Sequence, residues 1–149
     1  MSDKITSYLQ LFGIQGECTD PRFLTYIPIL NWFFDGGKDS NTWGGAAKTS
    51  LREVVFMSYL ENSSYKLQEY CANGRHIKSG KLVVLNGQSV FFRATFEDLL
   101  VEDCQTNGGA RLIFLFTVTF HEMETAYDAK AVNTRMKQAG WTVITNPAQ

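Results

Sequence analysis

The chain has 149 residues, a length that corresponds to one domain with its own hydrophobic core. Its 14 basic and 15 acidic side chains leave a net charge of −1, which argues against nucleic acid or an anionic membrane as a partner. The three cysteines are widely spaced and form no CxxC motif, so we expect reduced, partly buried thiols with neither a metal-binding nor a disulfide role.

The N-terminal residues contain no long apolar run behind a basic segment. The sequence therefore predicts neither a signal peptide nor a membrane-spanning helix. We expect a protein that is made in the cytoplasm. If it leaves the cell, it has to use a route that does not read an N-terminal signal.

The first part of the chain predicts two strands. Residues 8–14 form a short strand with Gly13 near its end, and residues 25–34 form a second strand whose two faces are both largely apolar. Pro28 lacks a backbone N–H group, so it indicates that the second strand lies at an edge or carries a bulge.

Residues 35–50 have no periodicity and predict an extended loop. A loop of this length in a compact domain is usually functional or a linker. Trp43 in its middle favours a loop that docks on another surface, because a flexible spacer has no use for a large apolar ring. The loop also contains two Gly-Gly pairs, Gly36-Gly37 and Gly44-Gly45.

A strand at 51–57 precedes the one predicted helix, at 65–72. Ser64 is the expected N-cap and Gly74 the expected residue just past the C-terminus. One face of this helix is apolar at spacings of three and four and should cover the sheet. That face consists of Leu67, Tyr70 and Cys71.

The centre of the chain predicts a β-hairpin. Strands at 81–85 and 89–96 flank the Asn-Gly pair at 86–87, the strongest short hairpin signal in the sequence. A kink at 97–98 is expected before a further strand at 99–104.

Residues 111–127 predict the longest strand. One parity is apolar as far as Phe120, and the other begins apolar at Ile113 and Leu115 before it turns polar. Such a strand would span about 50 Å, which suits a barrel wall that bends or a strand that meets another subunit. With a last strand at 141–144, the sequence predicts a mainly β fold, an antiparallel β-barrel or sandwich with one side helix.

No residue pattern indicates an enzyme. His121 and Glu122 are neighbours on a strand and therefore point to opposite faces. Four carboxylates at 97–103 lack an aromatic platform and are expected to form a solvated face or a rim that meets basic side chains of a neighbour. His76 follows the helix end, where a cation is favourable next to the negative end of the dipole. We predict no catalytic, cofactor-binding or metal-binding residue.

The order of these segments resembles the tube protein of type VI secretion systems, the haemolysin-coregulated protein (Hcp) family. The resemblance covers nearly the whole chain, as a single domain at 1–149. Its most specific parts are Gly16-Glu17 after the opening strand, the pattern Leu67, Cys71, Gly74 and His76 around the helix, the segment LLVEDCQTNGG, and Gly140-Trp141 in the last strand.

This resemblance implies a β-barrel subunit that forms homohexameric rings, which stack into a hollow tube. It implies that sheath contraction exports the tube and that the lumen carries or chaperones small secreted effectors. Sheath and spike proteins of the system are then partners. The loop at 36–49 would reach the next ring through Trp43. The position after Trp32 would line the lumen, and here it is Phe33, an aromatic where family members often have a small polar residue.

Other classes of function stay open at this point. A monomeric β-barrel that binds a small ligand, as lipocalins do, would use the aromatic residues to line an interior cavity. A small β-barrel hydrolase would need a convergent set of acids or nucleophiles, which the sequence does not offer. A phage-type tail-tube protein would share the fold. The mass of the protein in solution separates a ring from a monomeric binder.

Overall fold

The computed structural model describes residues 4–38, 49–128 and 137–142. Its strands are β1 (Ile5–Leu11), β2 (Ile27–Ile29), β3 (Asn31–Lys38), β4 (Thr49–Tyr59), β5 (His76–Asn86), β6 (Ser89–Asn107), β7 (Ile113–Tyr127) and β8 (Lys137–Thr142). The helix α1 spans Asn62–Asn73, and a short 3₁₀ helix, η1, spans Pro21–Phe23.

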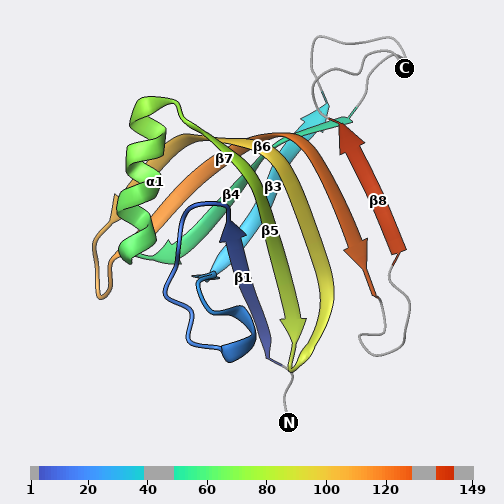
Figure 1. The fold of residues 1–149 in the computed structure, drawn as a ribbon, viewed down its shortest axis with the longest axis horizontal. Helices are drawn as coiled ribbons and strands as arrows, with labels where there is room; N and C mark the ends of the chain where they lie inside the picture. The colour runs from blue at the N-terminus through green and yellow to red at the C-terminus, as the bar shows by residue number, and fades with distance from the viewer. Residues whose placement is uncertain (1–3, 39–48, 129–136, 143–149) are drawn as a thin grey trace.

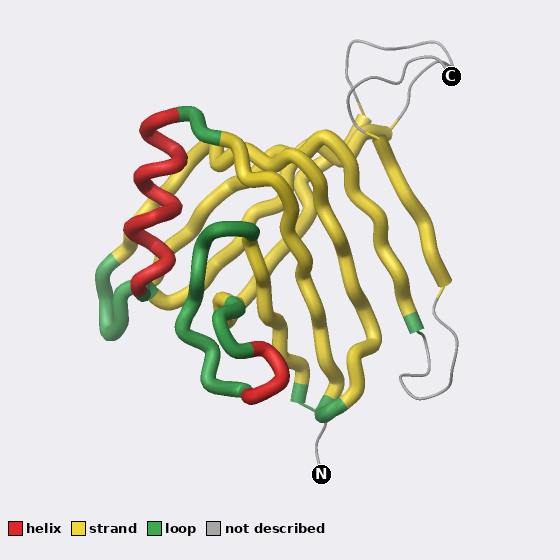
Figure 2. Tube along the Cα trace, in the orientation of Figure 1, coloured by secondary structure: helices red, strands yellow, loops and turns green. Residues whose placement is uncertain are grey.

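These strands form one curved antiparallel sheet in the order β2-β1-β5-β6-β7-β4-β3, with β8 paired to β7 (Figure 1). The sheet curls into a nearly closed barrel, and Figure 2 shows that strands make its wall while α1 stands beside it. In Figure 1, α1 and β8 lie on opposite sides of the barrel. The predicted mainly β barrel with one side helix is therefore confirmed.

β7 is long because it pairs with two strands in tandem. β6 accompanies it along its length on one side. On the other side, β4 pairs with β7 from Ile113 to Thr119, and β8 pairs with it from Glu122 to Tyr127. The buried parity of β7 changes between Phe120 and Met123, at the point where one partner gives way to the other. The expected barrel wall that bends along its length is thus confirmed.

The single strand predicted at 25–34 is wrong, because this stretch forms two strands with different partners. β2 pairs with β1 at the edge of the sheet, as Pro28 predicted, whereas β3 pairs with β4. Only Leu30 separates them, and its N–H donates to the carbonyl of Met57 at 2.7 Å. Because β2 and β3 stand at opposite ends of the strand order, this connection joins the two ends of the sheet.

The two strands predicted at 89–96 and 99–104 are one continuous strand, β6. Asp98 has a φ of 59°, so the expected kink is a bend within the strand and not a break. The predicted hairpin is confirmed: Asn86 pairs with Ser89, and Gly87 turns the chain with a φ of 64°. An L-residue with a side chain would be strained in that left-handed region.

α1 begins earlier than predicted. Glu61, not Ser64, is the N-cap, and Ser64 lies in the first turn, where its Oγ accepts the Glu61 N–H at 3.0 Å. The helix ends at Gly74 in the left-handed conformation, as predicted. The predicted apolar face is also confirmed, since Leu67 and Tyr70 are buried and α1 packs against β6.

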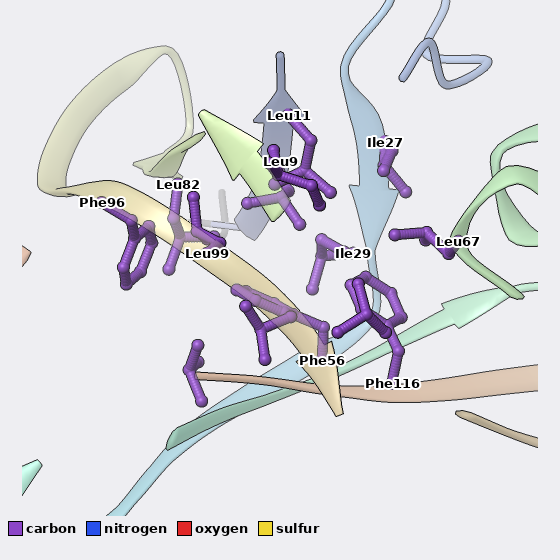
Figure 3. Close-up of a cluster of buried hydrophobic side chains, with 14 of the residues drawn as sticks. Leu9, Leu11, Ile27, Ile29, Phe56, Leu67, Leu82, Phe96, Leu99 and Phe116 are labelled. Carbon is purple, nitrogen blue, oxygen red and sulfur yellow. The ribbon is translucent and has the colours of Figure 1, made fainter. Parts of the chain in front are cut away.

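Side chains of the protein itself fill the interior of the barrel. Phenylalanines at its centre are fully buried and in contact, with ring centroids of Phe56 and Phe116 5.3 Å apart (Figure 3). Burial of each such ring contributes about 1.5–3 kcal/mol to stability. Among the described residues, the interior is a packed core and not the aromatic-lined cavity that a lipocalin-like binder requires.

No helix in the described part of the chain is long and apolar enough to cross a membrane.

Candidate assembly surface

β3 carries three consecutive aromatic residues, and strand alternation separates them. Trp32 and Phe34 point inward and pack against the core, while Phe33 points outward and is 52% exposed. The Trp32 ring stacks on Phe92 with centroids 5.4 Å apart and an interplanar angle of 12°. Its Nε1–H donates to Ser7 Oγ at 3.1 Å. Trp32 therefore anchors β3 to the opposite wall and fixes Phe33 on the outer face.

Phe33 belongs to an apolar surface on the outer face of β3, β4 and β7. Residues that stand opposite each other in an antiparallel pair share one face of the sheet. The register pairs Phe33 with Val55, Met57 with Leu115, and Tyr59 with Ile113. We call these six side chains the outer patch. Tyr59 is 37% exposed, and the four others besides Phe33 are half-buried, so the patch is accessible in the single subunit.

Polar and charged side chains border the outer patch. The Arg111 guanidinium lies over the Tyr59 ring, 3.7 Å from its centroid, and Asp103 stands on β6 opposite Thr117. Glu102 is the extra residue of a bulge between Val101 and Asp103, and it accepts a hydrogen bond from Thr119 Oγ1 at 3.1 Å. An apolar surface with a polar rim is typical of a site that contacts another protein.

The predicted loop at 35–50 is shorter than expected, because both flanking strands extend into it. Gly36 and Gly37 are part of β3 and pair with Leu51 and Ser50 of β4, after a register shift between Asp35 and Gly36. Their assignment to a loop was wrong, since backbone pairing continues past the point where side-chain periodicity stops. The remaining predicted contact residues, Trp43, Gly44 and Gly45, lie outside the described residues.

The carboxylates at 97–103 do not form a paired acid site. Asp98 Oδ1 lies 2.6 Å from His76 Nδ1, in an exposed side-chain contact between β5 and β6. His76 therefore contacts a carboxylate of β6. The prediction that it caps the helix is wrong, because the C-cap is Gly74. Within the residues that the structure describes, no group of three or more histidine, cysteine, aspartate or glutamate side chains is arranged to hold a metal ion.

The sequence did not reveal the structural roles of Gly16 and Glu17. Gly16 is required by close packing, because a Cβ there would lie 2.4 Å from the Tyr26 carbonyl oxygen. Glu17 Oε2 accepts the Asn62 N–H at 2.9 Å, and the Glu17 N–H donates to Glu61 Oε1 at 3.1 Å. This reciprocal contact fastens the loop after β1 to the start of α1. Burial is the main cause that raises the pKa of Glu61.

An open pocket of about 670 Å³ lies between the end of β1 and the start of α1. Phe12, Asn62 and Ser79 are among its lining residues, and Lys66 is its one charged residue. A single ammonium group offers no partner for acid–base or nucleophilic chemistry. The pocket does not include the outer patch.

The comparisons with known proteins agree with this architecture. The family model described as "Type VI secretion system effector, Hcp" matches residues 8–127. Protein hcp1 of Pseudomonas aeruginosa is 22% identical over 134 residues, which cover 83% of each chain. The crystal structure of Hcp1 from Salmonella typhimurium superposes with a TM-score of 0.82 at 23% identity, over 96% of both chains. A type VI secretion system effector from Yersinia pestis gives a TM-score of 0.78 at 23% identity, over 92% of this chain and 99% of that one. The match of the family model over most of its length shows that this chain belongs to the Hcp family of type VI secretion system proteins.

Proposed function

We propose that this protein is the structural tube subunit of a type VI secretion system and not an enzyme. Six copies form a ring, the rings stack into a hollow needle, and contraction of a sheath exports the needle behind a spike protein. The match of the Hcp family model to residues 8–127 carries this proposal. The filled interior of the barrel also supports this proposal. It leaves no cavity for a ligand, whereas the outer surfaces are free for assembly.

We further propose that the outer patch faces the lumen of the ring and contacts small effectors. Phe33, the residue that corresponds to the lumen position of the family, lies in this patch and is half exposed. With Val55 and Met57 beside it, the surface offers an incoming protein apolar area that is rimmed by Asp103 and Arg111. A lumen of this kind favours effectors that have apolar surface segments.

The mass of the purified protein in solution tests the ring. Light scattering behind a sizing column should give a mass near six times 16.8 kDa. A mass of one subunit in dilute and in concentrated samples would contradict a self-assembling ring. It would bring forward the monomeric ligand-binding barrel, against which the filled interior now counts.

Stacking of rings is proposed to use the β3–β4 connection, with Trp43 as the contact residue beside Gly44 and Gly45. Gly36 and Gly37 would then shape the strands that lead into it, since they pair with β4. The Trp43→Ala variant should keep the mass of a single ring but form few filaments in electron micrographs. Filaments as long and as frequent as those of the unaltered protein would rule out the inter-ring role of Trp43.

A further inference from the structure

Three asparagines in the sequence are each followed by glycine, and the structure holds the three pairs differently. They are Asn73-Gly74 at the end of α1, Asn86-Gly87 in the turn between β5 and β6, and Asn107-Gly108 at the end of β6. In such a pair the glycine nitrogen can attack the side-chain carbonyl carbon of the asparagine, because glycine has no side chain that hinders the approach. The attack requires an amide nitrogen that is free to lose its proton. The hydrogen bond that each glycine N–H makes therefore distinguishes the three pairs.

Two of the pairs are held by hydrogen bonds. The Gly74 N–H donates to the Cys71 carbonyl at 3.4 Å, as part of the C-cap of the helix. The Gly87 N–H donates to the Lys4 carbonyl at 2.9 Å. Asn86 is paired with a strand on each side, and its side-chain oxygen, Oδ1, is buried. In both pairs the glycine nitrogen is thus occupied, and in the second the asparagine is also fixed in the sheet.

Asn107-Gly108 lacks these restraints. Asn107 is the last residue of β6 and is exposed, and Gly108 begins the loop to β7. Within the described part of the chain, the Gly108 N–H donates no backbone hydrogen bond. Its surroundings are open, because a Cβ at Gly108 would have only Leu112 Cδ2 within 4 Å, at 3.9 Å, apart from its chain neighbours. The Gly108 nitrogen can therefore approach the Asn107 side chain, and water reaches both residues.

We propose that Asn107 is a site of spontaneous deamidation in the folded subunit, whereas Asn73 and Asn86 are protected. The Gly108 nitrogen loses its proton and forms a bond to Cγ of Asn107. The side-chain nitrogen leaves as ammonia, and a cyclic succinimide remains. Water then adds to either carbonyl carbon of the succinimide and opens the ring, to aspartate or to isoaspartate. One water molecule is consumed and one ammonia is released, and the reaction needs no oxidant and no cofactor.

Either product places a negative charge beside the outer patch. Asn107 stands opposite Ile113 across the β6–β7 pair, and residues that stand opposite each other share one face of the sheet. Ile113 belongs to the outer patch through its pairing with Tyr59. The isoaspartate form also adds a methylene group to the main chain, at the last pair of the hairpin. The effect of this charge on bound effectors rests on the proposed function, whereas the reaction itself does not.

Peptide mapping of the purified full chain tests the proposal. The protein is incubated in mildly alkaline buffer, in which more of the amide nitrogen is deprotonated, and is then digested with trypsin. Cleavage after lysine and arginine puts Asn73, Asn86 and Asn107 in three different peptides, 67–75, 82–93 and 94–111. Deamidation changes the mass of a peptide, fragmentation locates the change, and a sample without incubation gives the background. We expect the product to accumulate in peptide 94–111 several-fold faster than in the two other peptides.

Two controls separate the effect of the fold from that of the sequence. In denaturant all three peptides should convert at similar rates, because the hydrogen bonds of Gly74 and Gly87 are lost. Gly108→Ala is the matched variant, since the open space at Gly108 accepts a methyl group without a clash. The new side chain hinders the attack, so conversion of Asn107 should slow several-fold.

The proposal is overturned if peptide 94–111 of the folded protein converts no faster than peptides 67–75 and 82–93. A rate at Asn107 that Gly108→Ala leaves unchanged would overturn it equally, because the Gly108 nitrogen would then not be the nucleophile. These results do not depend on the ring, which the mass measurement tests separately.

Discussion

The two faces of β7 both carry apolar residues at neighbouring positions, but the two sets differ in how deeply they are buried. Phe114, Phe116 and Val118 point inward and are fully buried by the chain itself. Ile113 and Leu115 point outward and remain half-buried in the single subunit. Apolar side chains on the inner face are explained by the stability of the barrel. Those on the outer face have no such explanation, and they indicate a surface that is used in contacts with other molecules.

The largest effect is expected on the inner face. Phe116→Ala would leave a cavity between Phe56 and Phe114, whose rings it contacts, and should lower the free energy of unfolding by about 3–5 kcal/mol. Chemical denaturation at one fixed protein concentration measures this difference, because assembly makes stability depend on concentration. A loss smaller than about 1 kcal/mol would mean that Phe116 is not part of a tightly packed core.

The neighbouring residue on the outer face provides the matched variant. Leu115→Ala removes a half-buried side chain and leaves no internal cavity, so the free energy of unfolding should fall by about 1 kcal/mol or less. The same denaturation experiment compares it directly with Phe116→Ala. Equal losses for the two variants would show that the outer face is as important for folding as the inner one, and the distinction between them would fail.

The smallest effect on stability is expected at Phe33. Phe33→Glu places a carboxylate on an already exposed position, so both the free energy of unfolding and the mass of the proposed ring should stay unchanged. Binding of apolar probes should fall, which titration with the fluorescent dye anilinonaphthalene sulfonate measures. Tyr65→Glu, the same change at an exposed aromatic of α1, is the control and should keep dye binding. If the unaltered protein has the mass of the proposed ring and Phe33→Glu has the mass of one subunit, the outer patch is a contact between subunits and not a lumen wall.

Much of the fold was predictable where a local signal decides the structure. Alternation of apolar residues gave β7 and its bend, the Asn-Gly pair gave the hairpin, and Gly74 gave the end of the helix. The start of α1 was missed because its cap is fastened by Glu17, which is 45 residues away from Asn62 in the sequence. The separation of β2 from β3 was missed because only the choice of partner strands distinguishes them.

The candidate surface was predictable only in part, for the same reason. Strand alternation is sufficient to predict that the side chains of Phe33 and Trp32 lie on opposite faces of the sheet. The register that brings Val55 and Met57 beside it is a property of the folded sheet, and no pattern in the sequence specifies it. Contacts between distant segments, such as Glu17 with Asn62, are not predictable from the sequence of one chain.

The one-residue connection at Leu30 has a mechanical consequence. A barrel usually closes along a seam of hydrogen bonds, which shear or peel apart one after another under load. Here the backbone itself runs from β2, the first strand of the order, to β3, the last. A covalent connection therefore joins the two ends of the sheet. The two ends of the sheet can therefore not separate at Leu30 unless β2 or β3 is also detached from its neighbouring strand.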